Sequence, residues 1–161
     1  MCRSAVYPGT FDPVTYGHID LIKRAKVLFP DLRVVVAKSI LKRPLFSLLE
    51  RMKMLRKATE DIEDLIIESF DGLIVDYCHR NKIRIIIRGL RMLSDFEYEF
   101  QMALTNRKLL GDIETLFLMP QETYAYLSSN LLKEIASLGG DLSAFVPPFV
   151  EKALKDKLKN K

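Results

Sequence analysis

The segment from Tyr7 to His18 has the residue types and spacing of a phosphate-binding loop. It reads YPGTFDPVTYGH, in which a short apolar run leads into prolines and glycines before a helical pattern begins near Ile19. Prolines restrict the backbone, glycines let it approach a ligand, and the first N–H groups of a helix attract anions. Thr10 can add a hydroxyl where the strand ends, and His18 a ring nitrogen in the first helical turn. The segment therefore predicts phosphate chemistry, although His18 could instead bond a nearby loop carbonyl.

Three cationic residues further along the chain follow apolar runs, as the loop itself does, and could lie beside it. Lys42 lies in a basic loop after a second apolar run, and Arg88 and Arg91 follow the most apolar run of all. Guanidinium groups suit phosphate oxygens, and lysine supplies a mobile point charge. An arginine at such a position can equally form an ion pair that closes the domain edge. Two arginines spaced by Gly-Leu favour phosphate recognition over that alternative.

The strand and helix signals that must position these residues alternate along the whole chain. Apolar runs predict strands at 5–7, 32–37, 65–68, 83–87 and 114–119. Helical spacing and stop signals predict helices at about 19–29, 47–59, 73–81, 94–110, 129–138 and 147–158. Capping boxes are expected at Ser47/Glu50 and Ser94/Glu97.

Strands separated by helices predict an α/β fold. We expect a single Rossmann-like, doubly wound domain over residues 1–161, with a five-stranded parallel sheet and helices on both faces. Ligands of such sheets bind beyond the carboxyl ends of the strands. Thr10, Lys42, Arg88, Arg91 and the 124–130 segment all follow strands, so we expect them to meet at one edge.

Composition narrows the class of protein. The chain has 161 residues, 48% of them hydrophobic, which fits one domain with a real core. Its net charge is +4, but residues 151–161 hold five lysines against two acidic residues, so we expect a basic helical tail and no nucleic-acid surface. The apolar runs are too short to span a bilayer, and no signal peptide is expected. Cys2 and Cys78 are interpreted as reduced thiols of a cytoplasmic protein.

The sequence predicts neither a metal site nor a catalytic nucleophile. No His, Cys or Asp cluster has metal-ligand spacing, so a metal should arrive with nucleotide phosphates, and His79 is interpreted as packing. Ser128 and Ser129 begin a helix, where serine is an ordinary cap that could also hold phosphates. Without a nucleophile, the expected chemistry is direct transfer between two bound substrates, which needs alignment and charge neutralisation.

The loop resembles the signature of the T/HxGH nucleotidyltransferases and, within them, the bacterial phosphopantetheine adenylyltransferase family. The resemblance extends over KRPLF, IRGLRMLSDFEYEFQMALTNR and FLMPQETYAYLSSNLLKE, in the expected order. It implies that 4′-phosphopantetheine attacks the α-phosphorus of ATP, giving dephospho-coenzyme A and pyrophosphate. It also implies Mg²⁺ brought with ATP, a homohexamer and coenzyme A as a feedback ligand.

The resemblance also implies roles for individual residues. Catalysis would fall to His18, Thr10, Lys42 and Arg91, and the acceptor substrate to Thr10, Lys42, Ile74 and Arg88. The implied ATP site spans several segments: Thr10, Phe11, His18, Gly89, Leu90, Arg91, Glu99, Tyr124, Ala125, Tyr126, Leu127, Ser128, Ser129 and Asn130. Taken alone, Ile74 is the kind of residue that fills a core and Glu99 the kind that is solvated. Asn130 departs from the family's usual serine or threonine, and residues 38–41 are more apolar than usual.

Two other functions are compatible with parts of the sequence. A sister nucleotidyltransferase could activate nicotinamide mononucleotide or glycerol phosphate, but IRGLR and FEYEF argue against it. A module could bind adenine nucleotides without turnover, but the intact set of Thr10, His18, Lys42 and Arg91 argues against that.

Overall fold

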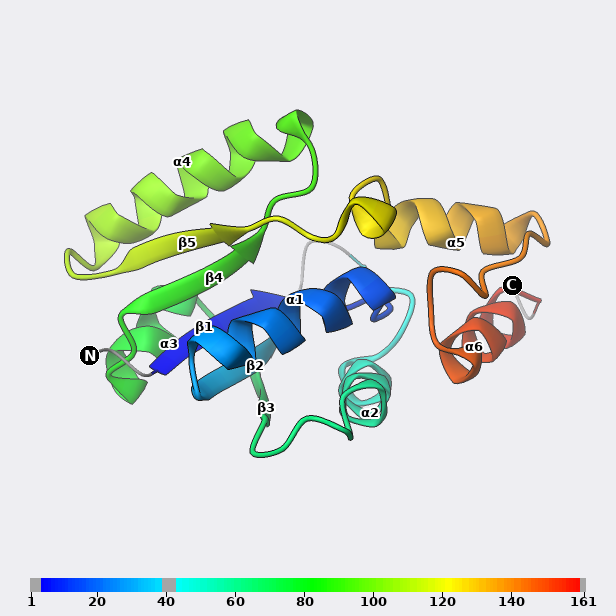
Figure 1. The fold of residues 1–161 in the computed structure, drawn as a ribbon, viewed down its shortest axis with the longest axis horizontal. Helices are drawn as coiled ribbons and strands as arrows, with labels where there is room; N and C mark the ends of the chain where they lie inside the picture. The colour runs from blue at the N-terminus through cyan, green and yellow to red at the C-terminus, as the bar shows by residue number, and fades with distance from the viewer. Residues whose placement is uncertain (1–3, 39–42, 160–161) are drawn as a thin grey trace.

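One five-stranded parallel sheet organises the computed structural model, which describes residues 4–38 and 43–159 apart from the side chain of Ser94 (Figure 1). Its strands are β1 (Ser4–Gly9), β2 (Asp31–Ala37), β3 (Ile66–Phe70), β4 (Ile85–Gly89) and β5 (Glu114–Leu118). They lie in the order β3-β2-β1-β4-β5, and every neighbouring pair is parallel. The strand order therefore reverses between β1 and β4, where ligands of such sheets bind.

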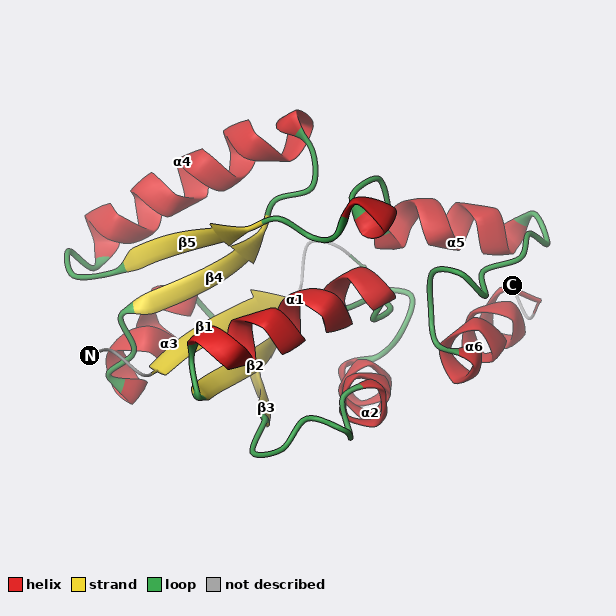
Figure 2. Ribbon diagram, in the orientation of Figure 1, coloured by secondary structure: helices red, strands yellow, loops and turns green. Residues whose placement is uncertain are grey.

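Helices cover both faces of this sheet, as Figure 2 shows by colour. They are α1 (Tyr16–Leu28), α2 (Leu48–Ala58), α3 (Ile74–Asn81), α4 (Leu93–Leu109), α5 (Ser129–Ser137) and α6 (Pro148–Lys159), with a short 3₁₀ turn at Glu122–Tyr124. The predicted α/β Rossmann-like sheet with helices on both faces is confirmed. No helix among these residues is long and apolar enough to cross a bilayer.

Alternation along β1 explains the two-sided core. Ala5 and Tyr7 pack in the cluster that contains the buried residues of α1, whereas Val6 packs with Val35 and Tyr77 in a second cluster. Successive side chains of a strand point to opposite faces, so a central strand covered on both sides is apolar throughout. This is why the predicted strands read as continuous apolar runs.

The helix starts show where sequence patterns sufficed and where they failed. The Ser47/Glu50 capping box is confirmed at α2. The box predicted at Ser94/Glu97 is wrong, because α4 already begins at Leu93, behind Met92, which makes no side-chain cap. The earlier start puts Asp95 in the first turn, where its carboxylate complements the helix dipole and pairs with a cation of the site.

The last two helices lie beyond the carboxyl ends of the strands (Figure 1). Leu132, Val150 and Leu154 join the core cluster of β1 and α1, and the Tyr16 N–H donates to the carbonyl of Phe145 at 2.9 Å. Part of the basic tail is therefore structural: Lys157 pairs with Glu50 of α2 at 2.8 Å. These contacts place α5 against the loop between β1 and α1.

Candidate active site

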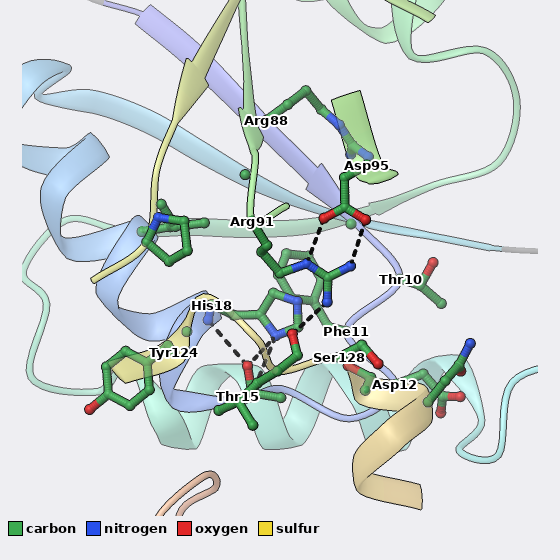
Figure 3. Close-up of a pocket in the computed structure, with 18 of the residues that line it drawn as sticks. Thr10, Phe11, Asp12, Thr15, His18, Arg88, Arg91, Asp95, Tyr124 and Ser128 are labelled. Atoms are coloured by element: carbon green, nitrogen blue, oxygen red, sulfur yellow. Dashed lines mark hydrogen bonds and ion pairs between the residues drawn. The ribbon is translucent and has the colours of Figure 1, made fainter. Parts of the chain in front are cut away.

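A cavity of about 520 Å³ lies at the carboxyl ends of β1 and β4 (Figure 3). Its wall draws on β1 and the following loop, the first turns of α1, the end of β4, the first turns of α4, and the start of α5. In Figure 3 Tyr124 lies on one side of His18, and Thr10 and Asp12 lie on the other. Segments from the beginning, middle and end of the chain therefore meet at one site.

His18 is fixed at this site by the start of α1. Thr15 caps the helix, and its backbone N–H donates to Nδ1 of His18 at 3.1 Å. A backbone N–H can only donate, so Nδ1 accepts and the proton of the neutral ring belongs on Nε2. Nε2 makes no hydrogen bond to a described residue. The helix thus begins at Tyr16, earlier than the predicted Ile19, because the ring itself completes the cap.

The electrostatic surroundings keep His18 neutral. Burial, with the positive charges of Arg91 and Arg88 acting in the same direction, lowers the pKa of His18 to about 4. The ring of Phe11 packs edge-on against it, with centroids 5.0 Å apart. At neutral pH His18 can therefore offer an Nε2–H donor to the cavity without a charge of its own.

Both predicted arginines line the cavity, and each is held by a carboxylate. Two guanidinium nitrogens of Arg88 donate to the Glu99 carboxylate, at 2.5 and 2.7 Å, and a third donates to the Pro8 carbonyl at 2.7 Å. Arg91 pairs with Asp95 at 3.0 Å and donates to the Leu127 carbonyl at 2.5 Å. The ion-pair interpretation of Arg88 therefore holds alongside its place in the site. The solvated interpretation of Glu99 is wrong, because that side chain is buried.

A third cation, which sequence reasoning missed, completes the pattern. Lys133 of α5 pairs at 2.9 Å with Asp12, whose carboxylate also accepts the N–H groups of Leu45 and Phe46, each at 2.9 Å. Both Asp12 and Lys133 line the cavity. The available signals were the position of Asp12 inside the loop motif and of Lys133 one helical turn after Ser129. Among the described lining residues, every lysine and arginine thus has a carboxylate partner.

Arg51 of α2 supports the site from behind. Its side chain is only 1% exposed and donates to the carbonyls of Thr10 at 2.7 Å, Ala37 at 2.9 Å and Phe46 at 3.2 Å. It therefore fixes the backbone on which the Thr10 hydroxyl stands. Helical spacing gave no sign of this role, because a charged residue in an amphipathic helix is normally solvated.

The structure gathers most of the predicted site residues. Those lining the cavity are Thr10, Phe11, His18, Arg88, Gly89, Arg91, Glu99, Tyr124, Leu127, Ser128, Ser129 and Asn130. Ser128 also caps α5 by accepting the Leu131 N–H at 3.1 Å, and Ser129 donates to the Pro13 carbonyl at 3.0 Å. Ser128 is therefore the helix cap, while Ser129 ties the first turn of α5 to the loop after β1.

Several predicted residues stand apart from this lining. Leu90, Ala125 and Tyr126 do not line the cavity, and Tyr126 instead packs edge-on against Phe145. Ile74 packs against the core cluster that contains Val6 and Val35, which is the core-filling role weighed for it. Lys42 lies outside the described residues, as does the 39–41 part of the loop before it.

Comparison with known proteins places the chain in a family. The cytidylyltransferase-like family model matches residues 6–135. Two phosphopantetheine adenylyltransferases resemble this chain along nearly its whole length. The one from Caldanaerobacter subterraneus subsp. tengcongensis is 55% identical to the chain, and the one from Thermodesulfovibrio yellowstonii is 51% identical. The first match covers 98% of each chain and the second 99%. A putative nicotinate-nucleotide adenylyltransferase from Vibrio parahaemolyticus shares the fold at a TM-score of 0.65 and 15% identity, over 99% of this chain and 93% of its own. The fold and the site, with a histidine beside two arginines, are consistent with these matches. Because identity of 51% and 55% extends over nearly the full length, the chain belongs to the phosphopantetheine adenylyltransferase family.

Proposed function

We propose that this enzyme transfers AMP from ATP to 4′-phosphopantetheine, giving dephospho-coenzyme A and pyrophosphate. The observation that carries the proposal is the neutral Nε2–H of His18 in one cavity with Arg88 and Arg91. Family membership supplies the substrates, since the relatives named above carry this activity in their names.

The transfer is direct and in line, without a covalent enzyme intermediate. Thr10 and His18 donate to the α-phosphate, where charge builds up as the acceptor phosphate attacks and pyrophosphate leaves. Arg91 and the start of α5 hold the leaving phosphates, and Arg88 holds the acceptor phosphate together with Lys42. Donors held in place before the substrates arrive need little reorganisation during the reaction, which is how this cavity lowers the barrier.

Magnesium, in this proposal, arrives with ATP and not at a dedicated protein site. The described residues contain no group of three His, Cys, Asp or Glu side chains that could hold a metal ion. The carboxylates of the lining, Asp12, Asp95 and Glu99, each already accept from a lysine or arginine. Oxygen-rich phosphates are the natural ligands for this ion.

We further propose that the enzyme is a homohexamer, with α4 in the contact between subunits. One face of α4 exposes large apolar side chains, among them Leu93 at 89%, Phe96, Phe100 and Leu104. Phe96 and Phe100 stack at 5.5 Å along that face. An apolar stripe of this size on a helix is typical of a surface that another protein copy covers. Coenzyme A is proposed as a feedback ligand, because it shares its pantetheine and nucleotide parts with the product.

The enzyme is proposed to act in the cytoplasm and to bind neither nucleic acid nor membranes. The buried free thiol of Cys78 suits a reducing compartment.

Pyrophosphate release from ATP and Mg²⁺, with and without 4′-phosphopantetheine, tests the proposed function. Release should require 4′-phosphopantetheine and should match dephospho-coenzyme A formation mole for mole. Nicotinamide mononucleotide with ATP, and glycerol phosphate with CTP, serve as control pairs that should give no product. ATP binding without turnover on any acceptor would contradict the proposal and support a nucleotide-binding module.

A further inference from the structure

Tyr7 of β1 lines the cavity, and its hydroxyl makes no hydrogen bond within the described part of the chain. The side chain as a whole is only 5% exposed. The hydroxyl oxygen is nevertheless not among the fully buried, unpaired polar atoms of the described residues, so it is accessible from the cavity. Tyrosine at this position therefore presents a polar atom to the cavity, where phenylalanine would present only carbon.

The ring of Tyr7 is held so that its hydroxyl has a defined position. It packs edge-on against Phe11, with centroids 5.6 Å apart and planes at 82°. On the other side lies Gly89 at the end of β4, where an added Cβ would come within 2.6 Å of Leu21 and 3.7 Å of the Tyr7 hydroxyl. Glycine at this position therefore lets Leu21 pack closely against the end of β4, with the Tyr7 hydroxyl at ordinary contact distance.

The hydroxyl acts as a donor. Burial raises the pKa of Tyr7 to about 12, although the nearby charges of Arg88 and Arg91 act in the opposite direction. The phenol is therefore neutral at physiological pH and carries a proton to give. Phe11 joins the rings of Tyr7 and His18 by edge-on contacts on both sides, so Tyr7 belongs to the part of the wall that faces the nucleotide.

Building on the proposed function, we propose that Tyr7 is a nucleotide-binding residue whose hydroxyl donates a hydrogen bond to a ribose or phosphate oxygen of bound ATP. The geometry offers a donor that lines the cavity without a partner among the described residues, next to the side chains of Phe11 and His18 that are assigned to the nucleotide.

Tyr7→Phe removes the hydroxyl and keeps the ring, so it isolates this contact. Dissociation constants for ATP, AMP and 4′-phosphopantetheine are measured by titration calorimetry on the wild-type protein and the variant. ATP should bind about tenfold more weakly to the variant, the loss expected for a hydrogen bond to a charged or strongly polar group. Binding of 4′-phosphopantetheine should stay within about twofold. An equal loss for AMP would place the contact on the ribose or α-phosphate, and a loss confined to ATP would place it on the outer phosphates.

Tyr77→Phe is the matched control, because it deletes the same atom from an equally buried tyrosine outside the cavity. The Tyr77 hydroxyl donates to Glu68 at 2.6 Å, so its loss should lower the unfolding midpoint without changing ATP affinity. Tyr7→Phe should instead weaken ATP binding, and its unfolding midpoint without ligand should be unchanged or higher.

Three outcomes would overturn the role of Tyr7: wild-type ATP affinity in Tyr7→Phe, an equal loss for ATP and 4′-phosphopantetheine, or a drop in stability like that of Tyr77→Phe. A wild-type protein that binds no adenine nucleotide would instead overturn the proposed function itself.

Discussion

His18 uses its two ring nitrogens for different purposes. Nδ1 accepts the Thr15 N–H and completes the helix cap, which fixes the tautomer and the orientation of the ring. Nε2 then carries the proton towards the cavity. A buried histidine near two arginines is a poor proton acceptor, so the role proposed for it is a hydrogen bond to phosphate and not general-base catalysis.

Replacing His18 should separate catalysis from binding. His18→Ala should lower kcat by about a hundredfold or more, the cost of removing one donor to a developing charge. The dissociation constant for ATP should change by less than about fivefold, since the donor acts mainly on the transition state. Rapid-quench kinetics and calorimetry give the two quantities. Thr15→Ala controls for the damaged cap, because its backbone N–H still orients the ring. Turnover near the wild-type rate in His18→Ala would refute the assignment.

The lowered pKa of His18 also predicts a pH dependence of stability. Between pH 6.5 and about 4 the unfolded chain binds a proton at His18 that the folded protein does not. The free energy of unfolding should therefore decrease as the pH falls through this window. Urea unfolding of the wild type and of His18→Asn, compared at several pH values, isolates this part from the carboxylates. The difference between the two curves should change below pH 6.5 and stay flat above it.

At the scale of elements, α2 and α5 both hold the loop after β1. Arg51 of α2 bonds the carbonyl of Thr10, while Lys133 of α5 bonds the carboxylate of Asp12. The same Asp12 anchors the N–H groups of Leu45 and Phe46 that lead into α2. The loop is therefore positioned by helices that follow it by many residues in sequence.

Substitution of Arg51 should damage both stability and activity. Arg51→Lys keeps the charge but cannot reach the three carbonyls that the guanidinium bonds, so it should lower the free energy of unfolding by about 2 kcal/mol. Activity should fall as well, because the Thr10 backbone loses its support. Thermal unfolding and the pyrophosphate assay provide the measurements. Arg56→Lys, an exposed substitution on the same helix, should leave both unchanged, and a similar loss in both variants would contradict this role for Arg51.

These particular contacts also show what could and could not be predicted from sequence. The sheet and the gathering of Thr10, His18 and Arg91 follow from local signals, because apolar runs and turn residues report their own secondary structure. The pairing of Asp12 with Lys133 spans 121 positions, and no local pattern encodes it. The failed cap at Ser94 belongs with it: α4 begins at Leu93, and the capping motif carries no information about the pairing of Asp95 with Arg91 in the site.

At the scale of the whole molecule, the exposed apolar face of α4 is the surface through which the proposed assembly would form. Burial of such a face removes apolar area from water and stabilises association. The proposed assembly would be linked to the site, because α4 also contributes Asp95 and Glu99 to the cavity.

Charge on this face should break the assembly. Phe100→Glu places an ion in the middle of the apolar stripe, where its desolvation opposes association. In sedimentation velocity, the variant should form an assembly of lower mass than the wild-type protein does under the same conditions. Leu138→Glu changes an apolar residue at the end of α5 that is even more exposed than Phe100, and it should leave the mass unchanged. An unaltered mass in Phe100→Glu would show that α4 is not at the interface.

The paired cations of the cavity have a consequence for what competes with its ligands. A cleft with surplus positive charge attracts any polyanion, including sulfate, inorganic phosphate and RNA. Here Arg88, Arg91 and Lys133 each face a carboxylate, so negative charge alone gains little. An anion binds tightly only when its oxygens reach hydrogen-bond donors that are held in fixed positions. The cleft therefore selects its ligands by shape, even in a cell that contains many small anions.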